Sequence, residues 1–485
     1  MPSSTSKEST PQPPQPPPAA GTNSFDRYFE ISARGSSLSR ELRGGLATFF
    51  TMAYILVLNP IILAGAEDKY GQHLSTVQLV TSTALVAAIM TILMGIVGRL
   101  PVALAAGLGI NAVVAYQLAP RMAWADAMGL VVITGIVLCV LVAGGIRKAI
   151  MDAIPMQLKQ AIAVGIGLFL AFIGFVDAGF VSRIGDAAGT TVPVQLGTDG
   201  QLSGWPILVF CLGVLLTFAL MLRKVKGAIL ISILGMTIVA IIIEAVAPGQ
   251  QWGLTKPAFP DSAVAAPDFG LLGDFSLTGA FGEVTALTVV LLVFTLLLSD
   301  FFDTMGTVVA VSGEAGLLDE NGQVPRIGRV LMVDAVASAA GGASSSSSAT
   351  SYIESAAGVG EGARTGLASV VTGVLFAVAL FFTPVLTIVP MQAAAPALVV
   401  VGFLLLTQVR HIDWSDLTVA IPAFLTIAVM PFTYSITNGI GAGFVSFVVL
   451  KLVAGKARQV HWLLWIVSAL FTVYFFSAPI EAWVF

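Results

Sequence analysis

Charged residues are scarce in this sequence: Asp, Glu, Lys and Arg together make up 10% of the 485 residues. A soluble globular protein carries about 25% charged residues. Hydrophobic residues make up 56% of the chain. This balance excludes an ordinary soluble domain and predicts an all-α, polytopic membrane protein.

Cysteine and histidine are also rare. The two cysteines, Cys139 and Cys211, both lie inside apolar stretches, so they indicate neither a disulfide framework nor a cysteine-rich metal site. The three histidines lie near the ends of apolar segments, and none has another His or Cys at ligand spacing. We therefore expect no metal and no bound cofactor.

Residues 1–24 contain no apolar run and are rich in Pro, Ser and Thr. Such a segment cannot bury a core, so we predict that it is disordered. It also lacks the apolar centre of a signal peptide. The first membrane helix is then expected to serve as the insertion signal.

Apolar stretches of about 17 to 25 residues are long enough to cross a bilayer as helices. In a first half, residues 46–246, these are Leu46–Ala66, Val77–Val97, Ala125–Gly144, Gln157–Val176, Trp205–Leu222 and Ala228–Val246. A shorter, glycine-rich stretch, Val102–Ala119, lies between the second and third of them. We count it as the third segment, which gives seven segments in this half.

A second half, residues 284–481, repeats this pattern. Its apolar pieces are Val284–Val311, Ile327–Ala340, the serine-rich stretch from Ser344, Leu367–Val389, Ala393–Val409, Leu417–Pro431, Ile436–Val453 and Trp462–Ala478. The total exceeds fourteen by one. Either Trp462–Ala478 lies in the membrane interface, or two pieces between Leu417 and Val453 form one broken element.

The distribution of basic residues predicts the orientation of the chain. Arg27, Arg34, Arg40 and Arg43 precede the first apolar segment, and further Lys and Arg residues fall in alternate loops. By the positive-inside rule the N-terminus is cytoplasmic. The connecting loop 247–283, with four acidic residues and one Lys, is expected outside.

An internal repeat relates the two halves. The sequence Ile154-Pro-Met-Gln157 recurs as Val389-Pro-Met-Gln392, and at the same offset Gly167 matches Gly402. Because each half has an odd number of segments, the halves have opposite orientations. Inverted repeats with short, glycine-interrupted segments in corresponding positions indicate a secondary transporter with its site at mid-membrane. Here the interrupted segments are 3 and 10.

Carboxylates and hydroxyls are concentrated in two segments whose flanking sequence is apolar, Ser299–Gly306 and Ala343–Gly358. A charged side chain at membrane depth costs at least about 2.5 kcal/mol, so it normally faces a cavity or a partner. We interpret Asp303 and Glu354 as the walls of a binding site. The competing interpretations are a structural ion pair for the acids and a helix-packing face for the serines.

A proton site is expected in the same place. Asp300 lies three residues from Asp303, hence near it on one helix face. Burial and a neighbouring like charge both favour the protonated form of a carboxyl group. We therefore expect one of Asp300, Asp303 and Glu354 to carry a proton that travels with the substrate.

The substrate contacts are expected at the starts of the two half-helices. Asn111 lies at one start, and Thr350, Ser351 and Glu354 lie at the other. An amide and a carboxylate together can bind a planar heterocycle that bears N–H and C=O groups. We expect a phenylalanine to stack on the face of the heterocycle. It would come from the pair Phe301 and Phe302 or the pair Phe49 and Phe50, with Phe302 and Phe50 as the candidates.

Several motifs resemble one known family. They are Thr48–Leu56 (TFFTMAYIL), Gly107–Ala112 (GLGINA), Phe302–Thr307 (FDTMGT), Thr350–Val359 (TSYIESAAGV) and Gly362–Leu367 (GARTGL). In this order they resemble the AzgA-like purine permeases (adenine, guanine, hypoxanthine) of the nucleobase:cation symporter-2 family. The similarity covers roughly Phe25 to Ala478. The run Ser344–Ser348 departs from the Gly-Thr-Ser type of sequence usual in this branch.

The resemblance implies fourteen transmembrane segments in two inverted sevens. Segments 1–4 and 8–11 would form a core domain, and segments 5–7 and 12–14 a gate domain that mediates dimers in relatives. In the family the acidic residue of segment 8 and the Glu of segment 10 bind the base, helped by segment 3. These positions correspond to Asp303, Glu354 and Asn111.

We therefore predict a plasma-membrane transporter that imports purine nucleobases by proton symport, possesses no enzymatic activity and binds no nucleic acid. Within the same architecture, the alternative cargo is uracil, xanthine or an inorganic anion. A membrane-embedded enzyme with two carboxylates as acid and base is an alternative from another class, and a passive channel is a third.

Overall fold

The computed structural model describes residues 24–145, 154–183, 194–253, 255–260, 262–319 and 323–476, with only the backbone of Phe302. Most of the tail predicted to be disordered lies outside these residues, although Ser24, which we assigned to it, begins a short helix. The described chain is mostly helical, and ten of its helices are long and apolar enough to cross a membrane.

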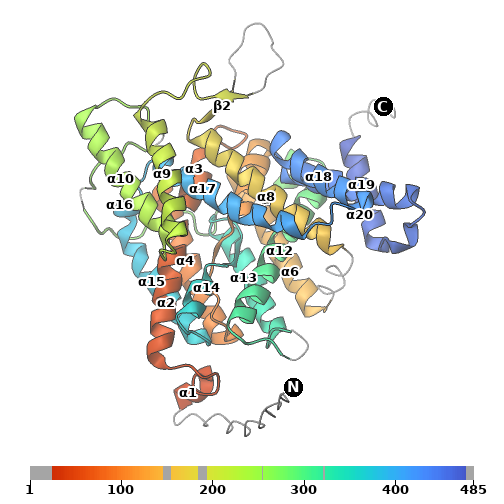
Figure 1. Cartoon of the computed structure of the whole chain (residues 1–485), viewed down its shortest axis with the longest axis horizontal. Coiled ribbons are helices and arrows are strands. Elements are labelled where there is room, and N and C mark those ends of the chain that lie inside the picture. Colours follow the sequence, from red (N-terminus) through yellow and green to blue (C-terminus); the bar gives the residue numbers. More distant parts are fainter. Residues whose placement is uncertain are drawn as a thin grey trace, which may run out of the picture.

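The first half follows the predicted order of segments. Its elements are α1 (Ser24–Phe29), α2 (Leu38–Met52), α3 (Ile55–Gly65), α4 (Thr76–Leu93), β1 (Leu104–Ala106), α5 (Leu108–Val113), α6 (Trp124–Ala143), α8 (Met156–Asp177), β2 (Val181–Arg183), β3 (Val194–Leu196), α9 (Trp205–Leu222) and α10 (Ala228–Val246) (Figure 1). Short π-helical turns continue α4 to Gly98 and α5 to Leu118.

The second half has the same alternation of long helices with one short strand. Its elements are α11 (Ala280–Glu283), α12 (Ala286–Glu314), α13 (Ile327–Ala343), β4 (Ala349–Ser351), α14 (Ser355–Gly360), α15 (Gly366–Ala379), α16 (Thr383–Leu386), α17 (Met391–Leu406), α18 (Leu417–Phe432), α19 (Ile436–Val453) and α20 (Trp462–Phe475).

The first apolar segment differs from its predicted form. A helix begins at Leu38, before the predicted Leu46, because Ser37 caps it by accepting a hydrogen bond from the Arg40 backbone N–H. The segment is also two helices, α2 and α3, separated at Ala53–Tyr54. The apolar pattern marked the part of this element that lies in the core and missed its polar beginning.

The strands β1 and β4 pair with each other in antiparallel register, with Leu104 opposite Ser351 and Ala106 opposite Ala349. All six paired residues are buried. The side-chain hydroxyl of Thr91, in α4, accepts a hydrogen bond from the Leu104 backbone N–H and donates one to the Leu104 carbonyl, each 2.9 Å long. Extended backbone inside an apolar protein is stable only when its polar groups are bonded in this way. The short helices α5 and α14 follow the two strands directly.

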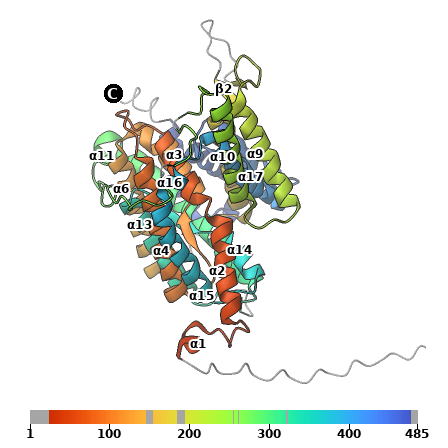
Figure 2. The same ribbon diagram turned by 90° about the vertical axis from the view of Figure 1, so that its left-hand side faces the viewer.

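The long helices pack as two groups. In one group, α8 packs against α17 and α18, α9 packs against α10 and α17, and α18 packs against α19. In the other, α2 packs against α14 and α15, α4 against α3 and α15, and α6 against α12 and α13. We call these the α8 group and the α12 group. Figure 2 shows α9, α10 and α17 beside α4, α6, α13 and α15.

The matched glycines of the internal repeat meet at the crossing of α8 and α17. Pro155 and Pro390 are the N-caps of these two helices. A Cβ atom on Gly167 would lie 2.7 Å from the carbonyl oxygen of Gly402, and a Cβ on Gly402 would press on the carbonyl oxygen of Gly167. The two helices therefore approach as closely as they do because both positions are glycine.

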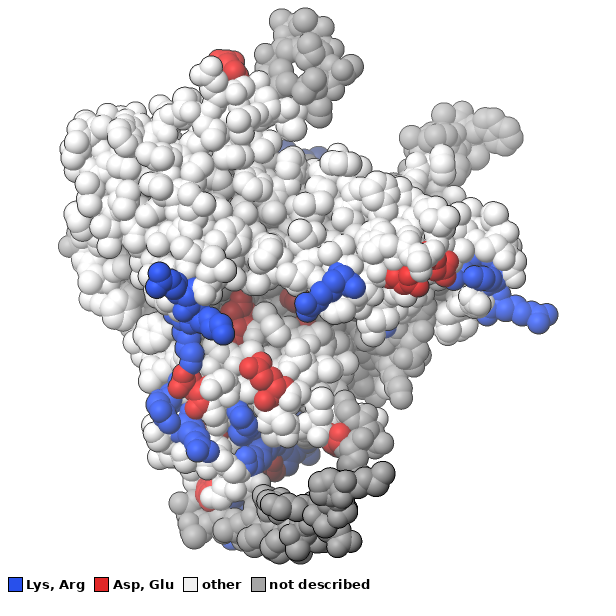
Figure 3. All heavy atoms as spheres, viewed as in Figure 1, with Lys and Arg blue, Asp and Glu red and all other residues white. Residues whose placement is uncertain are grey.

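An arginine cluster surrounds Glu30, just after α1. The Glu30 carboxylate lies 2.7 Å from Arg34, 3.5 Å from Arg99 and 2.5 Å from Arg326. Partial burial raises the pKa of Glu30, but Arg326 and Arg34 outweigh it and hold the pKa below its ordinary value of 4.5. In Figure 3, most of the Lys and Arg side chains on the visible face lie between mid-height and the lower end, the end at which α1 lies in Figure 1.

Candidate functional site

Two carboxylates of α12 bind the segment around β4. The Ser348 hydroxyl donates to Asp300 Oδ2 at 2.7 Å, and the Thr350 hydroxyl donates to Asp303 Oδ2 at 3.1 Å. Asp300 is fully buried, whereas Asp303 is accessible to solvent although it lies near the middle of a 29-residue helix. Asp303 is therefore the carboxylate of this pair that an incoming molecule can reach.

A third carboxylate, Asp334 of α13, lies behind the same strand. It is completely buried, and its Oδ1 atom accepts hydrogen bonds from the hydroxyls of Thr304, at 2.7 Å, and Ser351, at 3.1 Å. Asp334 thus ties α12 and β4 to α13. Hydrogen bonds to a charged group are stronger than neutral ones, so this side chain fixes the positions of the residues on either side of it.

Glu354 occupies the N-cap position of α14. Its Oε1 atom accepts a hydrogen bond of 2.6 Å from the hydroxyl of Tyr54, which lies in the break between α2 and α3. The Thr51 hydroxyl donates to the Glu354 carbonyl at 3.3 Å. Glu354 and Asp303 are close enough to interact electrostatically. The structure therefore brings together the two carboxylates that the sequence singled out.

Asn111 lies in α5, on the segment that follows β1. Its side chain is 0% exposed, and neither Oδ1 nor Nδ2 has a hydrogen-bond partner among the described residues. A buried polar atom without a partner costs about 1–3 kcal/mol. Helix α5 packs against α12, the helix that contains Asp300 and Asp303, and also against α3 and α8. The donor and acceptor of the Asn111 side chain are therefore both free to bind a polar group.

The aromatic candidates differ in burial. Phe50 is 54% exposed on α2, and its ring meets Phe49 edge-on at 5.5 Å, so no described contact joins it to the carboxylates. Phe301 is buried, and the side chain of Phe302 lies outside the described residues. Tyr54, which we did not predict, is the aromatic residue that contacts Glu354.

Sequence reasoning also missed Asp334, although the sequence contains the signal. Asp334 stands inside the apolar stretch Ile327–Ala340, so the cost argument applied to Asp303 applies to it equally. Tyr54 had no such signal, because a tyrosine in an apolar helix is common and only the break at Ala53–Tyr54 directs it to Glu354. Among the described residues, no group of three or more His, Cys, Asp or Glu side chains is arranged to hold a metal ion.

Comparison with known proteins finds relatives over most of the chain. Residues 39–442 match the family described as the permease family. Guanine/hypoxanthine permease PbuG of Bacillus subtilis (strain 168) is 37% identical over 457 residues, covering 92% of this chain and 98% of PbuG. Adenine permease AdeQ of Escherichia coli (strain K12) is 35% identical over 454 residues, covering 93% of this chain and 96% of AdeQ.

Solved structures show a related fold. The transmembrane domain of the cyanobacterial bicarbonate transporter BicA has a TM-score of 0.58 at 14% identity, covering 84% of this chain and 97% of that domain. The overall structure of SLC26A9 has a TM-score of 0.59 at 11% identity, covering 86% of this chain and 66% of that one. At such identities the likeness concerns the fold alone, a mostly helical polytopic membrane fold.

These findings define an integral membrane transport protein rather than an enzyme. The chain belongs to the permease family, and the resemblance to its purine permeases is confirmed by relatives named as guanine/hypoxanthine and adenine permeases.

Proposed function

We propose that this protein imports a purine nucleobase (adenine, guanine or hypoxanthine) across the plasma membrane together with a proton. The relatives of known cargo carry these bases by name. The observation that carries the proposal is the placement of Asp303 and Glu354 beside the strand pair β1–β4, with the unpaired amide of Asn111 on the helix that directly follows β1.

Each member of this set has a role in binding. The carboxylate of Glu354, held by Tyr54, accepts hydrogen bonds from the N–H groups of the base. The amide of Asn111 offers one donor and one acceptor to the opposite edge. Thr350 and Ser351 orient the strand by donating to Asp303 and Asp334. Xanthine and uracil present similar edges and remain the alternative cargo.

The proton is assigned to the acidic cluster of Asp303, Glu354 and Asp300. Two carboxylates that interact at membrane depth are more stable when one is protonated. Entry of one positive charge is favoured by about 2.3 kcal/mol per 100 mV of membrane potential. Coupling to that entry is sufficient to concentrate a neutral base inside the cell.

For the architecture we propose fourteen segments in two inverted sevens, with the N-terminus in the cytoplasm and with segments 3 and 10 broken at β1 and β4. The contact of Gly167 with Gly402 supports this, because equivalent residues touch where two repeats cross their symmetry axis. The α12 group is then the core domain and the α8 group the gate domain. In this scheme α20 follows the fourteenth segment, and the gate domain forms the dimer contact.

Uptake of radiolabelled adenine, guanine, hypoxanthine, xanthine and uracil by a permease-deficient host tests the cargo. We expect purine uptake that a protonophore abolishes. Asp303→Ala and Glu354→Gln should lose it while still reaching the membrane. Asp413→Asn is the matched control, because Asp413 is exposed and its carboxylate accepts a hydrogen bond from its neighbour Ser415.

Three outcomes would reject parts of this proposal. No uptake of any purine would reject the cargo. Uptake that continues in the presence of the protonophore would indicate a passive channel. Wild-type uptake by both carboxylate variants would mean that the site lies elsewhere.

A further inference from the structure

A polar contact that the proposed site does not use joins the two helix groups at the far end of α5. Tyr116 lies on the π-helical turn Val114–Leu118, and its hydroxyl donates to Asp177 Oδ2 at 3.1 Å. Asp177 is the last residue of α8. The contact therefore connects the segment that contains Asn111, which packs against α3 and α12 of the α12 group, with the end of α8.

The neighbouring residue, Gln117, makes a second contact of the same kind. Its side chain is 3% exposed. Its Oε1 atom accepts hydrogen bonds from the Ser435 hydroxyl at 3.1 Å and from the Thr437 hydroxyl at 3.0 Å. Its Nε2 atom is buried and has no hydrogen-bond partner among the described residues. A permanent interface normally satisfies such a group, so this incomplete contact favours one that opens.

The ring of Tyr434 packs beside the first of these contacts. Tyr434 lies between α18 and α19 with φ +51°, a left-handed conformation that is strained for a residue other than glycine. Its ring packs edge-on against Tyr116 at 5.4 Å and Phe169 at 5.2 Å. Strain of this kind persists where the surrounding structure enforces it, and it is concentrated at working parts of proteins.

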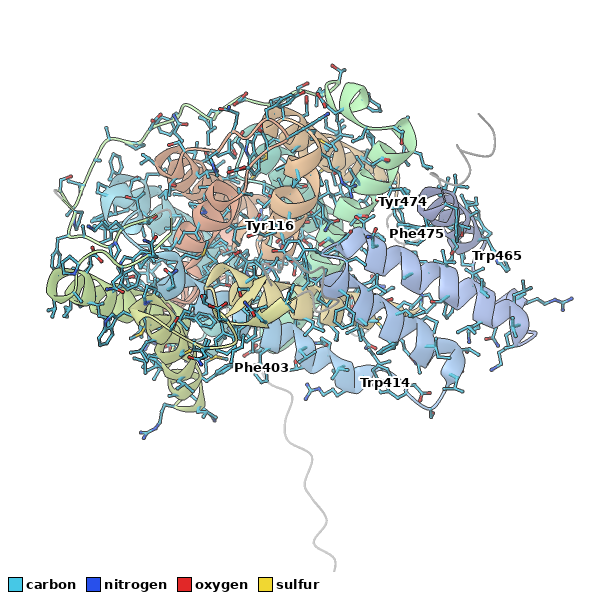
Figure 4. The ribbon with its side chains drawn as sticks, turned by 90° about the horizontal axis from the view of Figure 1, so that it is seen from above. Tyr116, Phe403, Trp414, Trp465, Tyr474 and Phe475 are labelled. Atoms are coloured by element: carbon cyan, nitrogen blue, oxygen red, sulfur yellow. The ribbon has the colours of Figure 1, made fainter. Side chains whose placement is uncertain are left out.

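These residues lie at the end of the molecule opposite α1. The strand β2, which begins four residues after Asp177, is at the top in Figure 1, whereas α1 is at the bottom. Seen from above, Tyr116 lies near the middle of the molecule (Figure 4). At the other end, Lys226 and Glu361 form an ion pair between the groups, but both side chains are partly exposed. An exposed ion pair contributes little, whereas at the upper end the Gln117 side chain that binds Ser435 and Thr437 is buried.

We propose that Tyr116, Gln117, Asp177, Tyr434 and Ser435 form an outer latch. The latch holds the α12 group against the α8 group on the extracytoplasmic side and must open before a substrate can reach Asn111 and Asp303 from outside. This inference rests on the proposed function in one respect, that substrate enters from that side. Static packing of two helix groups is the competing explanation.

Crosslinking separates the two explanations. In a background with Cys139→Ala and Cys211→Ala, the pair Gln117→Cys/Ser435→Cys is joined by a short, reducible bifunctional thiol reagent. We expect the crosslink to abolish purine uptake and its reduction to restore uptake. The control pair is Lys69→Cys/Glu283→Cys, which replaces an ion pair of 2.5 Å between the loop after α3 and the last residue of α11. Crosslinking this pair should leave uptake unchanged.

A second measurement does not depend on purine transport. Ile353→Cys, at a position that is 47% exposed beside Glu354, reports whether a membrane-impermeant maleimide reaches the site from outside intact cells. Tyr116→Phe should raise the labelling rate about tenfold, a change in population that corresponds to about 1.4 kcal/mol. Asp177→Asn should give a similar increase, and the double variant no more than either alone. Tyr28→Phe, at the opposite end, should have no effect.

The results distinguish the latch from the proposed function. Full uptake by the crosslinked Gln117–Ser435 pair, failure of that pair to crosslink, or unchanged labelling in Tyr116→Phe would overturn the latch. Absence of purine uptake by the parent protein would overturn the proposed function instead, while the labelling rates would still decide the latch.

Discussion

Replacing Tyr54 by Phe removes a single oxygen atom from a side chain that is 1% exposed, and it leaves the ring in place. The change therefore creates no large cavity. What is lost is the 2.6 Å hydrogen bond to Glu354 Oε1. A hydrogen bond to a charged group contributes about 1.5–3 kcal/mol. At 1.4 kcal/mol for each factor of ten, this corresponds to a loss of about tenfold to 150-fold in the population of the correctly held carboxylate.

We expect this loss to appear as weaker binding of the base. A bound base must then orient the Glu354 carboxylate itself, so KM and Kd should rise by about tenfold or more, with a smaller change in the maximal rate. Direct binding of labelled base to the purified protein gives Kd, and initial uptake rates give KM. Tyr28→Phe is the matched control, because its hydroxyl donates to the Ile96 carbonyl and not to a carboxylate. Wild-type Kd and KM in Tyr54→Phe would refute the role given to Glu354.

Three further predictions concern other parts of the molecule. Asp334→Ala leaves the buried hydroxyls of Thr304 and Ser351 without their acceptor, at about 1–3 kcal/mol each, so thermal stability and uptake should both fall; unchanged values would show that these bonds are unimportant. Gly402→Ala should lower the free energy of unfolding by about 1–3 kcal/mol through overpacking. Gly328→Ala is the control, because a Cβ atom at that position meets nothing within 4 Å, and it should be neutral or slightly stabilising in the same thermal assay. The stability contributed by Glu30 is present above its unfolded pKa of 4.5 and is lost as the pH falls through its lower folded pKa. The difference in melting temperature between the wild type and Glu30→Gln should therefore be present at pH 7 and shrink progressively below about pH 4.5. A difference that stays constant with pH would argue against the arginine cluster.

The sequence singled out the carboxylates of the candidate site more readily than their partners. A charge in an apolar stretch is visible in any sequence, which is why Asp303 and Glu354 were found and Asp334 could have been. The partner of Glu354 is Tyr54, three hundred residues away in the chain, and only the folded structure places them together. Phe50 was chosen for its aromatic ring alone, and the structure leaves that ring exposed on α2.

The boundaries of the helices were likewise predicted where they depend on hydrophobicity and missed where they depend on other interactions. The apolar pattern predicted Ile436–Val453 and placed the start of Leu417–Pro431 correctly. It missed the polar start of α2, because capping by Ser37 does not depend on hydrophobicity. The contacts of Tyr116 with Asp177 and of Gln117 with Ser435 had no sequence signal, since each joins residues from different segments whose relative positions follow from helix packing.

The pairing of β1 with β4 bears on how the protein is assembled in the cell. Leu104, Ala105 and Ala106 find their strand partners only in residues 349–351, which the ribosome makes after most of the chain has been inserted. Until then, most of the backbone groups of β1 have no strand partner at membrane depth, where an unbonded group is unfavourable. The centre of the molecule therefore closes late in biogenesis, and a chain truncated before residue 349 should leave a product that quality-control proteases remove.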